Sequence, residues 1–257
     1  RDFPDQIIVV AAVGFETTAP AYALLLQRAL AAGISNLRLL TALRRMPPAL
    51  DLLCDPGSGI DGFLAPGHVS AILGSQAYEA VAEKTQKPFV VAGFQGSEVL
   101  LGIARLVQLC RAVSASRAAQ EARIPGSRLV ENLYPAVVKP DGNPKARQVL
   151  ADVYQYEPAA WRGLGVLPES GYRLYGAYAQ FDALATEGFP SPDPAHAPVD
   201  DPPGCRCGDL MLGKIDPPDC PLFGTRCRPE SPVGPCMVST EGACGIHFRY
   251  GLAEVAP

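Results

Sequence analysis

The sequence predicts an α/β fold, a doubly wound and mostly parallel sheet followed by a small, irregular, cysteine-rich module. Three observations support this prediction. Short apolar runs alternate with helical segments over the first 112 residues. Six of the eight cysteines fall within the last 53 residues. Thirteen of the 26 prolines lie at or beyond Pro190, where periodic patterns end. Regular alternation with long crossovers is typical of parallel sheets covered by helices.

The strands are predicted from short apolar stretches, the first of which is rich in β-branched residues. They are expected at 6–13, 36–42, 62–65 and 88–92. The first, QIIVVAAV, has no polar residue after its glutamine, which predicts a strand buried on both faces. The helices are predicted from apolar periodicity and from capping residues, at 21–32, 47–54, 75–86, 97–112 and 145–156. Thr17 or Thr18 can cap the first helix, and Gly33 ends it.

Three domains follow from these patterns. We expect an α/β domain over 1–135, a helical connecting segment over 136–190 and a C-terminal module over 191–257. Residues 190–203, rich in proline, are expected to form an extended linker. A proline-rich module of this size buries little apolar surface, so a metal or covalent bonds should hold it together.

Composition excludes several classes of function. The net charge is −4 and basic residues are scattered, so no nucleic-acid surface is expected. The longest apolar stretch, 7–15, is too short to span a bilayer, and we expect no membrane partner. Cys54 and Cys110 lie alone in apolar helical segments and are expected to be buried thiols. Unpaired cysteines of this kind fit a reducing, cytoplasmic location.

Polar residues follow three of the predicted strands. Glu16, Thr17 and Thr18 follow the first strand, His68 and Ser70 follow the third, and residues 93–98 follow the fourth. The carboxyl ends of parallel strands meet at one edge of a sheet and commonly bind ligands there. The alternative is a set of ordinary capped turns with a structural histidine, and the residues alone leave both interpretations open.

The spacing of the C-terminal cysteines is irregular. Cys205 and Cys207 form a CxC pair, and Cys220, Cys227, Cys236 and Cys244 follow after gaps of twelve, six, eight and seven residues. Structural zinc usually takes two close pairs, whereas iron–sulfur clusters accept varied spacings. Disulfides fit the expected compartment poorly. An iron–sulfur cluster, a zinc site and disulfides remain alternatives on spacing alone.

Several segments together resemble the HypD family of hydrogenase maturation factors, in order along nearly the whole chain. The matching segments are GFETTAP (14–20), MPPAL (46–50), PGHVSAILG (66–74), GNPKA (142–146), WRGLGVLPESG (161–171) and the cysteine-rich segment 205–251.

The resemblance implies a maturation scaffold with redox chemistry rather than a turnover enzyme. The C-terminal module would be an iron–sulfur module carrying a [4Fe–4S] cluster. With a small HypC-type partner, such a protein would assemble the transient iron–cyanide–carbonyl unit of [NiFe] hydrogenases, and a HypE-type protein would donate the cyanide. The alternatives are an iron–sulfur protein-disulfide reductase and a zinc-stabilised interaction module.

Roles for individual residues also follow from the resemblance. Cys205, Cys220, Cys227 and Cys244 would ligate the cluster, and Cys207 and Cys236 would form a redox pair. Glu241 would tune the cluster or carry a proton, or else serve as a turn carboxylate. Glu16, Thr17, Thr18, His68 and Ser70 would contact the iron unit or the partner.

Two departures from the family pattern are visible. The CGTH-type and CPxC-type motifs of the family's N-terminal portion are not found, so we expect an N-terminally incomplete member. Gln95 and Gly96 also stand where the family tends to have an acidic residue and a proline.

Overall fold

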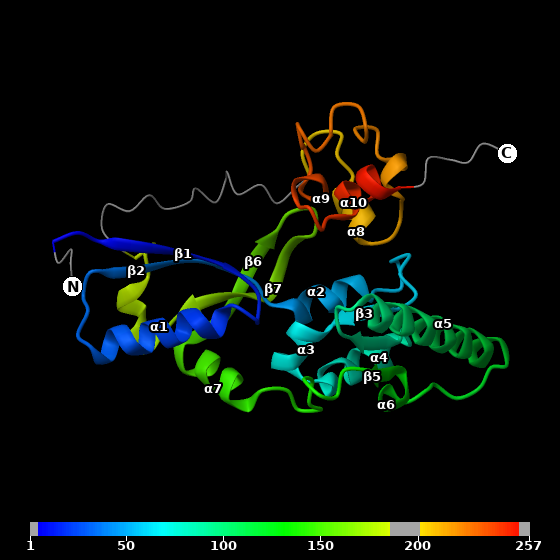
Figure 1. The fold of residues 1–257 in the computed structure, drawn as a ribbon, viewed down its shortest axis with the longest axis horizontal. Helices are drawn as coiled ribbons and strands as arrows, with labels where there is room; N and C mark the ends of the chain where they lie inside the picture. Colours follow the sequence, from blue (N-terminus) through cyan, green and yellow to red (C-terminus); the bar gives the residue numbers. More distant parts are fainter. Residues whose placement is uncertain (1–4, 186–200, 252–257) are drawn as a thin grey trace. The chain divides into compact units, whose positions relative to one another are not determined.

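A computed structural model describes residues 5–185 and 201–251 and divides the chain into two compact units (Figure 1). The first, here called the α/β unit, comprises Arg1–Asp55, Asp61–Pro158 and Pro168–Ser191. The second, here called the cysteine module, comprises Pro56–Ile60, Ala159–Leu167 and Pro192–Pro257. Most of the predicted linker at 190–203 lies outside the described residues.

The α/β unit begins with two parallel strands and a helix. They are β1 (Ile8–Gly14), α1 (Ala19–Ala31) and β2 (Leu37–Leu43), with Ile8 opposite Leu37 in the register. Pro20 lies in the first turn of α1, where its missing N–H costs no hydrogen bond.

The prediction that the first strand is buried on both faces is wrong. Ala12 is fully buried toward α1, but Val9 and Val13 are 40% and 66% exposed. The physical reason is the narrow sheet: among the described residues β1 pairs only with β2, and α1 packs on one face. An apolar run therefore identified a strand but not the number of faces that are covered.

A second parallel sheet has the order β3-β4-β5. Its strands are β3 (Phe63–Pro66), β4 (Phe89–Ala92) and β5 (Val130–Asn132). The helices around them are α2 (Met46–Leu53), α3 (Gly67–Leu73), η1 (Ser75–Tyr78), α4 (Glu79–Thr85), α5 (Gly96–Ala118) and α6 (Gly126–Leu129). Strand β4 is buried along its whole length, as the central strand of a covered sheet should be.

The α/β class and the parallel pairing are thus confirmed, but the strands do not form one doubly wound sheet. The described strands divide into separate sheets of two, three and two strands. Alternating strands and helices predict parallel pairing, but they do not say which strands become neighbours.

The segment predicted to be a helical connection contains a helix and also a β-hairpin. Helix α7 (Pro144–Val153) is capped by the Asn143 side chain, which accepts the Ala146 N–H. Strands β6 (Tyr154–Trp161) and β7 (Gly165–Leu174) follow it, then η2 (Gly176–Phe181). The expectation of a purely helical segment is therefore corrected. Tyr154 and Tyr156 extend the apolar pattern of α7 in sequence but belong to β6.

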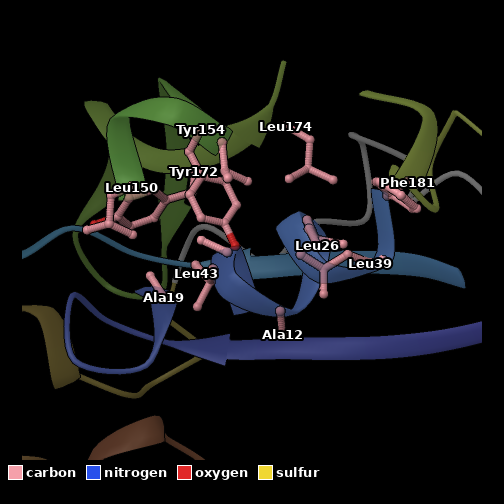
Figure 2. Packing of buried hydrophobic residues seen from close by; sticks show 13 residues of the cluster. Ala12, Ala19, Leu26, Leu39, Leu43, Leu150, Tyr154, Tyr172, Leu174 and Phe181 are labelled. Atoms are coloured by element: carbon pink, nitrogen blue, oxygen red, sulfur yellow. The ribbon is translucent and has the colours of Figure 1, made fainter. Parts of the chain in front are cut away.

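One core of the α/β unit joins α1, β1, β2, α7, β7 and η2 (Figure 2). Leu26, Leu39 and Phe181 are almost fully buried in it. Tyr154 and Tyr172 meet edge to face, with ring centroids 5.3 Å apart. The second core lies around β4, where Phe89 stacks between Phe63 and Tyr78 at 4.7 and 5.2 Å. Aromatic stacks of this kind add to area burial.

Helix α5 is the longest described helix, and few of its side chains are buried. Its length and composition alone would let it cross a membrane, and 11% of that apolar stretch is buried. Leu100 and Leu101 are 69% and 54% exposed. At its start, the Gln95 side chain and Glu98 form a capping box. Gln95 thus has a structural role at the position where the chain departs from the family pattern.

The cysteine module is built from short elements. They are α8 (Cys207–Met211), η4 (Pro217–Asp219), α9 (Pro235–Val238) and α10 (Ala243–Tyr250). Its core consists of Cys207, Cys220, Leu222, Cys227, Cys236, Met237 and Cys244. Five of these seven residues are cysteines, so thiols occupy the interior that aliphatic side chains would normally fill.

Candidate functional site

The loop after β1 is shaped by a glycine that no other residue can replace without strain. Gly14 has a φ of +138°, and a Cβ at this position would lie 2.0 Å from the Thr18 hydroxyl oxygen. The Thr18 hydroxyl donates to the Phe15 carbonyl at 3.2 Å. Thr18 therefore occupies the N-cap position of α1 without capping it, since no helical N–H bonds to its side chain. It is exposed, whereas Thr17 is half-buried.

Glu16, in the same loop, is buried rather than presented to solvent. Its side chain is 2% exposed, and Oε1 accepts the N–H of Met46 at 2.8 Å. Oε2 has no hydrogen-bond partner among the described residues. Burial raises the pKa of this carboxyl, and the hydrogen bonds and the Arg45 charge oppose that shift. Glu16 thus ties the loop after β1 to the first turn of α2.

The neighbouring Arg45 is held on the hairpin strands of the same unit. Its guanidinium lies 3.4 Å above the centroid of the Tyr156 ring, and its Nη1 donates to the Glu169 carbonyl at 2.7 Å. A guanidinium over a ring face is attracted by the ring quadrupole. The sequence pattern predicts no role for Arg45, because its position depends on a hairpin that the pattern does not predict.

The loop after β3 divides its two candidate residues. His68 is exposed and stacks on Phe94, with ring centroids 5.2 Å apart. Ser70 is fully buried, where its hydroxyl bonds to the Pro66 carbonyl at 2.9 Å and to the Tyr78 hydroxyl at 2.8 Å. Both hydrogen bonds are internal to the fold, so Ser70 holds the loop in place and His68 faces outward.

The expectation that the three strand-end loops share one sheet edge is wrong. The loops after β3 and β4 do meet, through His68 and Phe94. The loop after β1 belongs to the other parallel sheet. Burial raises the pKa of Tyr78, the hydrogen bond with Ser70 opposes that shift, and the charge of Glu16 adds to it.

The six C-terminal cysteines gather in the cysteine module. Cys205 is half-buried, the other five are buried, and all six are free thiols. The Cys236 Sγ donates to the Cys244 Sγ at 3.1 Å. Cys236 is also the largest cause of the raised pKa of the Cys207 thiol. Cys236 therefore interacts with both Cys244 and Cys207.

The remaining thiols accept backbone hydrogen bonds or pack against glycine. The Cys227 Sγ accepts the Val233 N–H at 3.3 Å. The Cys205 thiol accepts the backbone N–H of Cys207, and a Cβ on Gly234 would come within 2.5 Å of the Cys205 Sγ. Backbone N–H groups aimed at sulfur stabilise a thiolate, the form that binds metals.

Burial opposes ionisation of these thiols. It raises the pKa of Cys205 to about 11. The hydrogen bond to Cys236, followed by burial, raises the pKa of Cys207 well above its usual range. Burial also raises the pKa of Cys244, and the bond from Cys236 opposes that shift. Without a bound cation, these sulfurs stay protonated at neutral pH.

The thiol positions are informative about the kind of metal they fit. A zinc ion needs ligands about 2.3 Å from a single point. Within residues 5–185 and 201–251, no group of three or more His, Cys, Asp or Glu residues is placed to hold one ion. A [4Fe–4S] cluster takes one thiolate at each of four separate irons, so its ligands need not converge on a point. The core holds five buried thiols, a donor type that both iron–sulfur clusters and zinc ions take.

The last predicted site residue lies on the module surface. Glu241 is exposed in the turn before α10, and its backbone N–H donates to the Ser239 hydroxyl at 3.1 Å. Of the two thiols outside the module, Cys54 is fully buried, as expected, and its pKa is raised to about 11 by burial. Cys110 is only half-buried.

Comparison with known proteins agrees with these features. The family model described as "HypD: Hydrogenase formation hypA family" matches residues 1–251. The chain is 40% identical over 256 residues to hydrogenase maturation factor HypD of Escherichia coli, covering 99% of this chain and 64% of that protein. It is 38% identical to HypD of Rhodobacter capsulatus, covering 100% of this chain and 65% of that protein. The chain thus spans just under two thirds of the length of these relatives.

The α/β unit, the glycine-shaped loop and the cysteine core define the class: an α/β protein with a C-terminal thiol module, similar to hydrogenase maturation factors. The chain belongs to the HypD family, which confirms the resemblance of its motifs.

Proposed function

We propose that this chain acts in assembling the iron–dicyano–carbonyl unit of [NiFe] hydrogenases, as a scaffold that works with a small HypC-type partner. A HypE-type protein would supply the cyanide groups. The observation that carries the proposal is the gathering of six free thiols in one core of a HypD-family chain. We expect this to take place in the cytoplasm, because a core of reduced thiols needs a reducing compartment.

The cluster ligands in this proposal are Cys205, Cys220, Cys227 and Cys244. A bound [4Fe–4S] cluster would supply or accept one electron at a time. The backbone N–H groups that point at Cys205 and Cys227 would stabilise these two sulfurs as thiolates. Cys244 also accepts the hydrogen bond from Cys236, which favours its thiolate form.

The redox pair in this proposal is Cys207 and Cys236. Cys236 is the largest cause of the raised pKa of Cys207, and its Sγ donates to Cys244, one of the four proposed ligands. The pair is thus adjacent to a ligand sulfur. This position suits thiols that exchange electrons with a cluster, since a disulfide needs two electrons in two steps. Glu241 is proposed as a surface carboxylate that exchanges protons with the solvent near this turn.

The iron unit and the partner would meet the exposed groups of the strand-end loops. Thr18 and His68 are exposed and Thr17 is half-buried, so these three can donate hydrogen bonds to cyanide nitrogens or to a partner backbone. Glu16 and Ser70 are buried and hold the two loops from within. Replacing His68 with alanine should therefore reduce partner binding without unfolding the chain, whereas replacing Ser70 should destabilise the loop.

A second candidate function is a protein-disulfide reductase that uses the same cluster and pair. It is favoured by one observation: Cys207 and Cys236 both line an open hollow of the module. A reductase would turn over a partner disulfide with no hydrogenase component present. A zinc-stabilised module is less well supported, because the described residues offer no group placed for a single ion.

The test is iron and sulfide analysis, with absorption spectra, of chain purified without oxygen. We expect about four irons and four sulfides per chain and a broad visible absorption. Serine at 205, 220, 227 or 244 should each lower the iron content, whereas serine at 207 or 236 should leave it unchanged. Iron-free protein, or unchanged iron in the first four variants, would overturn the proposal.

A further inference from the structure

A hollow in the surface of the cysteine module opens onto the two sulfurs that we assign to the redox pair. Its volume is about 250 Å³, and Cys207 and Cys236 both line it. None of the four proposed cluster ligands lines it. Cys207 is 1% and Cys236 9% exposed, so the pair lies at the floor of the hollow, with Cys236 the less buried of the two.

The lining is apolar apart from these thiols and one cation. Leu210, Met211 and Pro235 form much of the wall, and Arg162 is the charged residue among the lining side chains described. Arg162 is exposed. A lone guanidinium beside an apolar wall favours a ligand with a carboxylate, which it can bind with two parallel hydrogen bonds.

Backbone contact fixes Arg162 beside the thiols. The turn of the β6–β7 hairpin approaches the start of α8 so closely that a Cβ on Gly208 would lie 2.2 Å from the Gly163 carbonyl oxygen. Asp201 secures this contact, because its Oδ2 accepts the Gly208 N–H at 2.7 Å. Asp201 is not among the residues that line the hollow. This packing positions the backbone of Arg162 next to the start of α8, while its side chain is exposed.

We propose that the hollow binds a small thiol that carries a carboxylate, with the carboxylate on Arg162 and the sulfur at Cys207 and Cys236. This rests on the proposed function only in that the pair cycles between dithiol and disulfide. The volume is below the roughly 300–1,000 Å³ of sites for drug-sized ligands, so it suits a molecule of a few carbon atoms.

The exchange reduces the pair and oxidises the small thiol. The thiolate of one molecule attacks a sulfur of the Cys207–Cys236 disulfide, a mixed disulfide forms, and the other cysteine leaves as a thiolate that takes a proton from water. A second molecule attacks the sulfur of the first, which releases the remaining cysteine and a small-molecule disulfide. Two thiols are oxidised and two cysteines are reduced, so two electrons and two protons balance.

The first test compares a negative and a neutral alkylating reagent on the full chain, reduced and kept without oxygen. The rates of iodoacetate and iodoacetamide labelling are measured at each cysteine by peptide mass spectrometry. Intrinsic reactivity cancels when the iodoacetate-to-iodoacetamide ratio is compared between variants. Arg162→Gln should lower this ratio about threefold to tenfold at Cys236, the less buried thiol of the pair, because it removes one cation next to the reagent.

Matched controls accompany this test. Arg249→Gln removes an arginine of the same module that does not line the hollow, and it should leave the ratio unchanged. Cys110, in the α/β unit, should show the same ratio in all variants. Arg162→Lys should keep part of the effect, since the charge stays but the two-pronged geometry is lost. An unchanged ratio in Arg162→Gln would overturn the proposal.

The second test uses chain with the pair oxidised. Mercaptoacetate should reduce the pair with saturation, and Arg162→Gln should lower its rate at least threefold relative to that of mercaptoethanol. If a neutral cysteine peptide reduces the pair as fast as mercaptoacetate or faster, a small anionic thiol is rejected as the occupant.

The labelling ratio does not depend on iron content. Iron-free protein with an Arg162-dependent ratio would therefore refute the cluster but keep the hollow.

Discussion

The α/β unit and the cysteine module have interiors of different chemistry. The α/β unit buries large apolar and aromatic side chains, among them Phe89, Phe181 and Leu26. The interior of the cysteine module is formed mostly by thiols, with Leu222 and Met237 as its buried apolar side chains outside them. Hydrophobic burial can stabilise the first, whereas the second depends on what its sulfurs bind. Both lie in one chain, so variants can test the difference directly.

The largest effect is expected from truncating the aromatic stack of the α/β unit. Phe89→Ala should lower the free energy of unfolding of that unit by about 3–5 kcal/mol, because a buried ring is lost and a cavity remains. Leu222→Ala, its counterpart in the module, should cost about 2 kcal/mol or less when iron is bound. Urea unfolding measured by far-ultraviolet circular dichroism checks the first variant. Fluorescence of Trp161, which belongs to the module, checks the second.

Equal losses in these two variants would show that the module depends on apolar burial as much as the α/β unit does. The comparison between a hydrophobic interior and a sulfur interior would then fail.

A smaller effect is expected at Glu16. Glu16→Ala should cost about 1–3 kcal/mol, because the buried Met46 N–H loses its acceptor. Glu16→Gln keeps an acceptor oxygen and removes a buried charge, so it should be as stable as the parent or more stable at pH 7. The pKa of Glu16 is raised, so its contribution is full below pH 4.5 and is lost as the pH rises through the folded value.

The stability of Glu16→Gln relative to the parent should therefore grow between pH 4 and pH 7, measured by urea unfolding at both values. A difference that shrinks over this range would mean that the Arg45 charge outweighs burial.

The smallest effect is expected from the thiols of metal-free, reduced protein at high pH. Burial raises the pKa of Cys205 to about 11 from the usual 9.0, and the pKa values of Cys207 and Cys244 are raised too. Raised thiol pKa values stabilise the fold below pH 9 and lose that effect as pH rises toward 11. Trp161 fluorescence should report a larger loss of folded structure at high pH than circular dichroism does, because all three thiols lie in the module.

The sequence predicted most elements of the α/β unit but not their partners. The runs at 36–42 and 88–92 match β2 and β4 closely, because short apolar stretches between helices leave little choice. The hairpin was missed because Pro158 and Pro168 interrupt its strands and suggest loops. The three-residue β5 is too short to show a period.

The candidate site was predictable by residue type but not by exposure. Glu16 and His68 both follow strands, yet one is buried and the other is exposed, and the sequence pattern does not distinguish them. Arg162 and Asp201 were missed as module residues near the thiols, because the approach of Gly163 to Gly208 is a tertiary contact. In the sequence, the one sign of this close backbone approach is the pair of glycines in the WRGLG motif.

The position of Cys236 between two other sulfurs has a practical consequence. Its Sγ lies 3.1 Å from that of Cys244, and it is also the largest cause of the raised pKa of the Cys207 thiol. In air, protein without metal can therefore close either of two mutually exclusive disulfides. A bond from Cys236 to Cys244 would trap a sulfur needed for metal loading, and later addition of iron and sulfide would fail until a reductant reopened it. The protein should therefore be reduced first and reconstituted second, because this order decides how much of a preparation can take up metal.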